Sequence, residues 1–254
     1  SLSAYGFSME RLYKSQLGRG EDISGSEDFS GSRDIYVDGK ACNVELTLSD
    51  DDLLHIGYTG GESEKITLTD DGETIRLTQG DAEAPWYIHL FRYELNSTVD
   101  ITISVPESYT GTVNLVIASG NVSMSDVSLR GILQISLTTG NVDIWNTSVD
   151  TALIAIVAGD VDLTDLVCTD RISVDLTTGD ADLKTITTSR IVCSTTTGRQ
   201  EITDVTVLDI SLFSTTGDVI LSGLNSVSAR IETSTGTISG SVSGAESDYT
   251  VQTS

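Results

Sequence analysis

One short motif recurs along this chain at an almost constant interval, and it constrains the fold more than any other feature. Residues 138–144 read Thr-Thr-Gly-Asn-Val-Asp-Ile, and close copies occupy residues 177–183 and 215–221. With the degraded copies included, the anchoring residues, spaced by 19 or 20, are Gly120, Gly140, Gly159, Gly179, Gly198, Gly217 and Gly236. Such a period predicts a solenoid, in which each turn packs only on its neighbours.

The spacing of apolar residues around each glycine indicates β-structure. Positions five and three before the glycine, and two and four after it, are mostly apolar, as in Ile135, Leu137, Val142 and Ile144. A period of two that is broken at a turn and then resumed predicts strands that change direction around a closed coil, with one set of side chains inside. We therefore expect an all-β chain folded as a single-stranded β-helix of 19–20-residue rungs.

The corner residues of this repeat have a structural explanation. Glycine adopts a positive φ without steric cost, which suits a tight corner between two strands. The Asn or Asp that follows it, such as Asn141, can accept a hydrogen bond from the local backbone and hold the turn. We therefore interpret the seven glycines as structural turn residues rather than as parts of a ligand-binding loop.

Three regions are distinguishable along the chain. Residues 1–34 are polar and rich in Gly and Ser, which predicts a flexible linker or arm. Residues 35–106 are expected to form an N-terminal cap and the first irregular rungs, with a β-hairpin around Asp71-Gly72. Residues 107–254 hold the regular repeats, in one continuous domain with the cap. Residues 248–254 resemble the start of another rung, so we expect either that the native chain continues or that this C-terminal rung pairs with another molecule by end-to-end self-association.

The composition excludes several classes of partner and of site. Asp and Glu number 38 against 14 Lys and Arg, a formal net charge of −24. Nucleic acids and anionic lipid surfaces need clustered cations, and the sequence has no such cluster. Because Cys42, Cys168 and Cys193 form no CxxC pair, we expect small buried thiols rather than a disulfide framework. No apolar run approaches the roughly 20 residues of a transmembrane helix.

Acidic side chains recur in the repeat and are candidate calcium ligands. Calcium takes about 6–8 oxygen ligands, which carboxylates of adjacent rungs could supply. The candidate metal ligands, three residues after successive glycines, are Asp143, Asp162, Asp182 and Glu201. The calcium-binding nonapeptide repeat and the EF-hand loop are both absent, however. The alternative is a hydrated acidic stripe that resists lateral aggregation, and in that case the chain needs no cofactor.

Three aromatic residues are candidate binding residues. Trp145 lies five residues after the glycine of its rung, where we expect its side chain to face outward. Trp86 and Tyr87 lie in an aromatic-rich stretch ahead of the repeats. Together they could stack on a sugar, although aromatics near a cap more often cover the end of a core. The partner would be a glycan or a surface protein. His55 and His89 have no metal-ligand spacing and are interpreted as structural.

An enzyme is the main alternative from another class. Paired carboxylates such as Asp160 and Asp162 could provide the separation that glycoside hydrolysis requires. A substrate cleft on a solenoid needs long inserted loops, however, and the constant spacing after Gly120 leaves no room for them. No nucleophile elbow, phosphate loop or zinc motif is present. We therefore expect a protein that is not an enzyme.

The repeat Thr-Thr-Gly-(Asn/Asp)-Val-Asp-(Ile/Leu), preceded by the alternating strand at residues 100–106, resembles a bacterial family of domains of unknown function labelled putative adhesins. The similarity covers roughly residues 35–254. It implies a right-handed β-solenoid, tethered outside the membrane by an N-terminal segment. It implies no established ligand and no catalytic residues. Arg199-Gln200 in one rung and the hairpin near Asp71 depart from the family pattern.

These observations favour a non-enzymatic, extracytoplasmic β-solenoid that acts as a scaffold, an adhesin or another surface-binding module. We expect a bacterial protein that is secreted or membrane-anchored. Because the chain begins at Ser1 rather than Met, the anchor or signal would precede it. One alternative is a carbohydrate-active β-helix enzyme, and the other is a cell-envelope signalling ectodomain that binds a protein partner.

Overall fold

The structure is a computed structural model that describes residues 23–61, 65–80 and 98–243. Within these ranges the chain forms one sixteen-stranded sheet and no helix. The N-terminal strands are β1 (Ile23–Ser30), β2 (Asp34–Leu48), β3 (Leu53–Gly60), β4 (Lys65–Asp70), β5 (Thr74–Gly80) and β6 (Val99–Val105). The repeats form β7 (Val113–Ser119), β8 (Val122–Ser125), β9 (Ser128–Thr139), β10 (Val142–Ala158), β11 (Val161–Thr178), β12 (Ala181–Thr197), β13 (Gln200–Thr203), β14 (Thr206–Thr216), β15 (Val219–Thr235) and β16 (Ile238–Val242).

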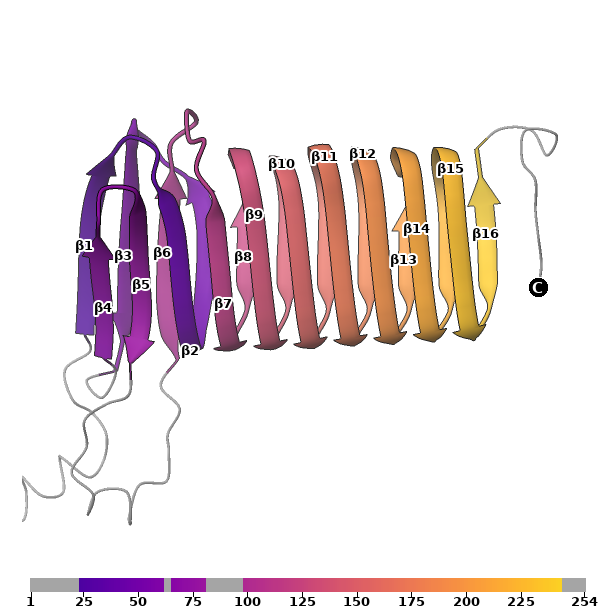
Figure 1. The fold of residues 1–254 in the computed structure, drawn as a ribbon, viewed down its shortest axis with the longest axis horizontal. Coiled ribbons are helices and arrows are strands. Elements are labelled where there is room, and N and C mark those ends of the chain that lie inside the picture. Colours follow the sequence, from indigo (N-terminus) through magenta and orange to yellow (C-terminus); the bar gives the residue numbers. More distant parts are fainter. Residues whose placement is uncertain (1–22, 62–64, 81–97, 244–254) are drawn as a thin grey trace, which may run out of the picture.

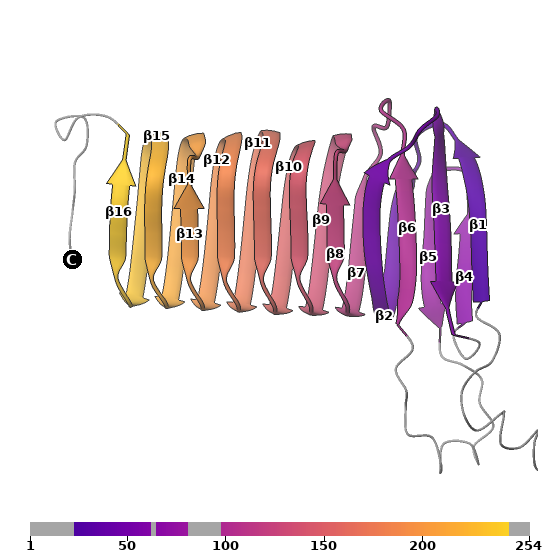
Figure 2. The ribbon, with the colours of Figure 1, turned by 180° about the vertical axis from the view of Figure 1, so that it is seen from behind.

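The repeats wind into a rod whose successive turns stack in parallel (Figure 1). Val142 of β10 lies beside Val161 of β11, which lies beside Ala181 of β12, and this register holds from turn to turn. The rod has two walls, which Figure 2 shows from the opposite side. We call the residues that follow each corner glycine the leading wall and those that precede it the trailing wall. The predicted all-β solenoid is confirmed.

One column of apolar side chains fills the space between the two walls. Ile135 and Leu137 enter it from the trailing wall, and Val142 and Ile144 enter it from the leading wall. None of these four side chains is more than 3% exposed. The alternation seen in the sequence therefore sorts side chains into one core and two outer surfaces, and only the outer surfaces are available for binding.

Close stacking of the backbone explains the glycine in every corner. All seven corner glycines have φ between 137° and 149°. A Cβ placed on Gly140 would lie 1.8 Å from the carbonyl oxygen of Gly120, and one placed on Gly159 would lie 1.9 Å from that of Gly140. Because no real side chain fits at such a distance, each glycine is required by the turn stacked beneath it.

The residue after the glycine links neighbouring turns, and this differs from the expected local bond. The backbone N–H of Asn141 donates to Oδ1 of Asn121 at 2.9 Å, and that of Asp160 donates to Oδ1 of Asn141 at 3.0 Å. The ladder begins at Asn43, whose Oδ1 accepts from the backbone N–H of Asn121. A side chain stacked about 4.8 Å away reaches the next turn as easily as its own, so the polar row ties the rungs together.

A second corner, six residues after each glycine, has a left-handed backbone. Its residues, with φ between 48° and 58°, are Asp126, Asn146, Asp165, Thr185 and Asp204. Gly223 occupies the same place in the next turn, with φ 67°. Asn, Asp and Gly enter this region more readily than other residues. The acidic row at this corner is therefore explained by backbone conformation.

The N-terminal part ends the repeat by changing the direction of strand pairing. β2 forms a first complete turn, because Ile35 pairs in parallel with Val113 and Val44 with Val122. β5 and β6 pair in parallel with the two halves of β2 and supply the walls of a preceding turn. β3 then pairs antiparallel with β6, and β1 pairs antiparallel with β3. These antiparallel strands close this end of the column.

Two sequence-based expectations concern this region. The hairpin around Asp71-Gly72 is present, as β4 paired antiparallel with β5. The expected flexible arm over residues 1–34 differs from the structure in its described part, because Ile23–Ser30 is the ordered strand β1. Phe29 of β1 packs into the core with 7% exposure, and that apolar anchor within a polar segment was not recognised as a strand signal.

The other end of the rod is less covered within the described ranges. Ile238 of β16 is 46% exposed, although it stacks on Val219, which is fully buried. Residues 248–254, which we expected to begin another rung, lie outside the described ranges. No helix long and apolar enough to span a bilayer occurs in the part of the chain that the structure describes.

Candidate functional site

The predicted acidic row exists on the leading wall. Asp143 pairs with Asp162, Asp162 with Asp182, and Asp182 with Glu201. Partial burial raises the pKa of Asp162, and the carboxylates of Asp182 and Asp143 raise it further. The row is therefore a strip of mutually repelling carboxylates along the outside of four turns.

One cation interrupts this acidic row. Arg199 places Nη1 3.4 Å from Oε2 of Glu201 and Nη2 3.7 Å from Oδ1 of Asp182. Burial raises the pKa of Asp182, and the guanidinium of Arg199 opposes that rise. Among the described residues, no three His, Cys, Asp or Glu side chains converge to hold a metal ion. The candidate calcium ligands thus stack along the rod instead of surrounding one point.

The aromatic candidates separate into two groups. Trp145 is 44% exposed on the leading wall, in one row with Ser125 and Thr164. Trp86 and Tyr87 lie outside the described residues, and so does His89. The indole of Trp145 is therefore an outward-facing apolar surface among small polar neighbours.

The potential nucleophiles are removed from solvent. Cys42, Cys168 and Cys193 are buried and unpaired, as expected. Burial raises the pKa of Cys42 and of Cys193 to about 12, so both thiols stay protonated at neutral pH. A thiol in this state is a poor nucleophile and a poor metal ligand.

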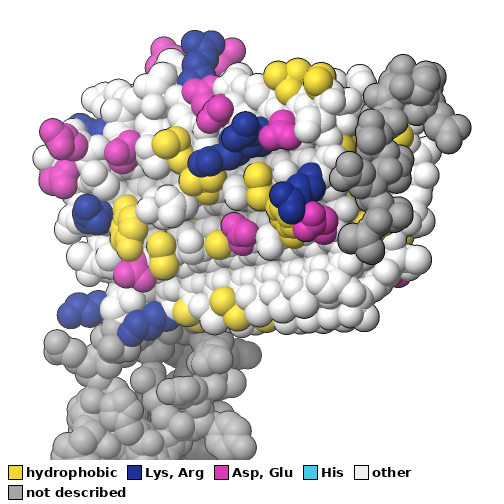
Figure 3. All heavy atoms as spheres, turned by 45° about the vertical axis from the view of Figure 1, so that its right-hand side comes forward, with side chains coloured by type: hydrophobic (Ala, Val, Ile, Leu, Met, Phe, Trp, Pro, Cys, Tyr) yellow, Lys and Arg dark blue, Asp and Glu magenta, His cyan; other side chains and the backbone are white. Residues whose placement is uncertain are grey.

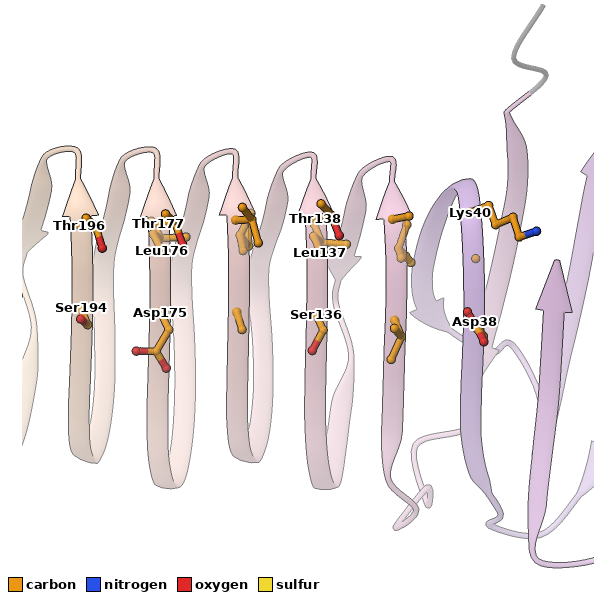
Figure 4. A pocket seen from close by; sticks show the side chains of 17 residues that line it. Asp38, Lys40, Ser136, Leu137, Thr138, Asp175, Leu176, Thr177, Ser194 and Thr196 are labelled. Carbon is orange, nitrogen blue, oxygen red and sulfur yellow. The ribbon is translucent and has the colours of Figure 1, made fainter. Parts of the chain in front are cut away.

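A hollow of the surface lies on the trailing wall, where the sequence predicted no site. It is a groove of about 610 Å³ that crosses β2, β7, β9, β10, β11 and β12 (Figure 4). Ligand sites typically occupy about 300–1,000 Å³. The side chains that face outward in this lining belong to the residues four and two positions before the corner glycines. Charge enters this lining only at Asp38, Lys40 and Asp175.

Small side chains create this groove. The rungs contribute Ser136 and Thr138, Ala155 and Val157, and Ser194 and Thr196 at the two outward positions. The row of small residues ends at the following turn, where Phe213 stacks on Ser194 and the guanidinium of Arg230 lies 5.4 Å from the Phe213 ring centroid. The signal that could have revealed the groove is this run of small residues at alternate positions.

The edge of the rod beside the groove also lacks charge. No charged residue occupies either of the two positions before any of the seven corner glycines, although the chain carries 38 Asp and Glu. Most of these positions hold Ser or Thr. Figure 3 shows this as a largely white band along the lower edge of the rod, below the charged groups. The row of residues before the glycines is thus uncharged, whereas Asp160, Asp180 and Asp218 lie directly after them.

A smaller hollow of about 380 Å³ lies on the cap, over β1, β3 and β6. Gly57 leaves space there between Ser26 and Thr102, and Asp100 lies at its margin. Oδ1 of Asp100 already accepts a hydrogen bond from Asn43 at 2.9 Å. The carboxylate of this hollow is therefore engaged within the fold, and the hollow is smaller than the groove on the trailing wall.

Comparison with known proteins agrees with this fold. Residues 32–191, more than half of the chain, match the family model described as Toastrack DUF4097. A solved "putative adhesin" from Bacteroides fragilis NCTC 9343 is 15% identical, with a TM-score of 0.61, over 88% of this chain and 98% of that chain. A "putative adhesin" from Parabacteroides distasonis ATCC 8503 is 14% identical, with a TM-score of 0.47, over 87% and 98%.

No curated protein matches the chain. At 15% identity, the Bacteroides fragilis structure shows a shared fold and carries no residue roles to this sequence. The family match runs from β2 into β12, so it includes the first complete turn and most of the cap but not β1. The chain belongs to the Toastrack DUF4097 family.

Proposed function

We propose that this chain is a non-enzymatic, extracytoplasmic scaffold that binds a partner at a cell surface through the groove on its trailing wall. The observation that carries this proposal is the groove itself, a hollow of about 610 Å³ built across six adjacent strands. Binding proteins place ligands in such concave surfaces on rigid elements. A location outside the cytoplasm is supported by the adhesin description of the Bacteroides fragilis structure.

The spacing of carboxylates supports a binding role over hydrolysis. Asp38 and Asp175 are the two acidic residues of the groove, and they lie four turns apart in the strand register. Four spacings of about 4.8 Å separate them by roughly 19 Å. Glycoside hydrolases hold their two carboxyl groups about 5–9.5 Å apart. The groove can therefore hold a chain-like ligand, but its carboxylates are too far apart to act as an acid–base pair.

A surface-binding assay with charge-matched variants tests this proposal. Fluorescently labelled protein is incubated with intact bacterial cells and with extracellular-matrix preparations, and the bound fraction is measured. Val157→Lys and Ser136→Lys fill the groove, and we expect each to abolish most of the binding. Thr164→Lys adds the same charge to the leading wall and is expected to leave binding unchanged.

Two outcomes would contradict the proposal. If the unaltered protein binds no surface in this assay, the binding function is wrong. If Trp145→Ala abolishes binding while both groove variants bind normally, the site lies on the leading wall, around the exposed indole.

A further inference from the structure

We infer that the groove on the trailing wall takes an uncharged polysaccharide, extended along the axis of the rod, with Asp175 as a hydrogen-bond acceptor near the β12 end of the groove. This inference rests on the proposed function and assigns the chemical class of the partner. It follows from the shape of the groove, from the chemistry of its lining and from the distribution of charge, which are independent observations.

The shape of the groove fits an extended chain. It runs from β2 to β12 across six neighbouring strands, at right angles to their direction. Five spacings of about 4.8 Å give a length of roughly 24 Å. A volume of about 610 Å³ spread over this length leaves a narrow trough. A linear polymer fills such a trough, whereas a compact metabolite would occupy only part of it.

The lining offers hydroxyl groups and small apolar surfaces side by side. Ser136, Thr138, Thr177, Ser194 and Thr196 provide hydroxyls, which both donate and accept hydrogen bonds (Figure 4). Sugar hydroxyls have the same dual capacity. Ala155 and Val157 lie between them on β10, and Val116 lies beside Ser136 on β7; all three present methyl groups to the C–H faces of sugar rings.

Asp175 is the one carboxylate in the interior of the groove. It is exposed on β11, between Ala155 of β10 and Ser194 of β12. Within the described ranges, no hydrogen bond or ion pair engages its oxygens. An ionised carboxylate accepts from two neighbouring hydroxyl groups, and such charge-assisted bonds are stronger than neutral ones. Asp175 is therefore placed to hold one sugar residue of the chain near the β12 end of the groove.

The charge distribution disfavours an acidic polysaccharide. The chain has a net charge of −24, and the groove contains two carboxylates against the single ammonium group of Lys40. A uronate or sulfated polymer would meet repulsion both from the whole molecule and at Asp175 itself. A neutral polymer meets neither, so charge selects for an uncharged chain.

The backbone of the wall disfavours an extended peptide. Peptides gain affinity on sheets mainly by adding a strand to an exposed edge, where backbone groups are unpaired. The groove lies on the face of β10 and β11, whose backbone groups are taken up by parallel ladders on both sides. A peptide lying across this face would find side chains only and would leave its own backbone groups unsatisfied.

Affinity electrophoresis of the full chain tests the inference. Native gels contain either a neutral polysaccharide (dextran, laminarin or galactomannan) or an acidic one (alginate or polygalacturonate). We expect retardation in at least one neutral gel and none in the acidic gels. Asp175→Ala should weaken the neutral interaction about tenfold or more, since a charge-assisted hydrogen bond is lost. Asp162→Asn, which alters a carboxylate on the leading wall, should bind as the unaltered protein does.

Each of the remaining outcomes contradicts the inference in a distinguishable way. Retardation by alginate that Asp175→Ala leaves unchanged would make the partner acidic and the site different. Absence of retardation in every neutral gel would overturn the assignment to neutral polysaccharides. The proposed function would still stand if the protein binds cell surfaces and Val157→Lys abolishes that binding. Competition of that cell-surface binding by an unstructured peptide, and not by any polysaccharide, would make the partner a protein.

Discussion

At the scale of single residues, the left-handed corner six residues after each glycine shows which positions are strained. Five of its six described occupants are Asn, Asp or Gly, and Thr185 is the exception, with φ 55°. A β-branched side chain is poorly accommodated in this conformation, because its Cβ substituents crowd the backbone. The strain persists because the parallel ladders on both sides of β12 fix the backbone.

We predict that Thr185→Asn stabilises the protein. Asn relieves part of a conformational cost of about 1–2 kcal/mol, so the free energy of unfolding should rise by about 1 kcal/mol and the melting temperature by about 2–4 °C. Thermal unfolding followed by circular dichroism measures this. Thr187→Asn, an exposed position with negative φ on the same strand, is the matched control and should be neutral or slightly destabilising. Equal shifts in both variants would contradict the explanation.

A second feature at this scale is a histidine bridge in the cap, where the ring of His55 contacts two carboxylates. His55 Nδ1 lies 2.7 Å from Oδ1 of Asp28 on β1, and its Nε2 lies 2.9 Å from Oδ1 of Asp51. These hydrogen bonds, to Asp28 first and then to Asp51, raise the pKa of His55 above its ordinary value of 6.5. The pKa of Asp51 is lowered below its ordinary value of 3.8. The larger cause is the hydrogen bond that its carboxylate accepts from the backbone N–H of Leu53, and the second is its hydrogen bond with His55.

This histidine bridge should therefore stabilise the protein in a defined pH range. The folded pKa of His55 is raised, so its contribution is fully present below about pH 6.5 and is lost as pH rises through the folded value. The folded pKa of Asp51 is lowered, so its contribution is present above about pH 3.8 and is lost as pH falls. We expect the difference in melting temperature between the unaltered protein and His55→Asn to be largest near pH 5–6 and to shrink by pH 8.5. A difference in melting temperature that does not vary with pH would contradict a bridge made by protonated His55.

At the scale of elements, the corner glycines and the hairpin glycine differ in why they are glycine. At Gly159 a Cβ would collide with the carbonyl oxygen of Gly140 at 1.9 Å, so the strand stacked beneath forbids a side chain. At Gly72, in the β4–β5 turn, φ is 93° and nothing lies within 4 Å of an added Cβ. Gly72 is therefore required only by the positive φ of its own backbone.

Substitution by alanine should separate these two cases. We expect Gly159→Ala to destabilise the protein by about 4 kcal/mol or more, because the ladder must open to admit the methyl group. Gly72→Ala should cost only about 1–2 kcal/mol, from the unfavourable φ. Chemical denaturation of both variants measures the two costs. Similar costs would show that contact between stacked turns is not the reason for the glycine.

The same distinction explains how much of the fold was predictable from sequence. The rungs were predictable because Gly140 and its counterparts recur at a fixed period in the sequence, and the apolar alternation around them recurs too. A cap with a hairpin at Asp71-Gly72 was predictable too, but the antiparallel pairing of β1, β3 and β6 was not, because these strands meet only through contacts between distant segments. Nor was the link from Asn141 to Asp160 between turns, since sequence spacing alone does not tell a local bond from a stacked one.

The candidate site was missed for a related reason. Sequence reasoning searched for residues that are chemically distinctive, such as Trp145 and the acidic row ending at Glu201. The groove arises from what is missing, namely large side chains at the outward positions around Ala155 and Ser136. A small residue in isolation has no diagnostic value, and its significance emerges only when several turns stack in register.

At the scale of the whole molecule, the uneven distribution of charge has consequences for stability. Carboxylates stack along the leading wall, while the two positions before each corner glycine are uncharged. The pKa of Asp162 is raised in the folded state, first by burial and then by Asp182 and Asp143. A raised folded pKa means that stability falls as pH rises through that value, so at neutral pH the ionised row destabilises the fold.

We predict that salt stabilises this protein and that Asp162→Asn removes part of the effect. Sodium chloride screens the repulsion within the exposed row, so the melting temperature at pH 7 should rise between about 0.01 M and 0.15 M salt. Asp162→Asn should melt at a higher temperature than the unaltered protein in low salt and should respond less to added salt. Asp175→Asn, on the opposite wall and outside the row, should keep the full response. Millimolar calcium at constant ionic strength completes the experiment. If calcium raises the melting temperature more than sodium does, and Asp162→Asn abolishes this extra rise, the leading wall holds a specific ion site. If the two salts raise the melting temperature equally, screening alone relieves the repulsion.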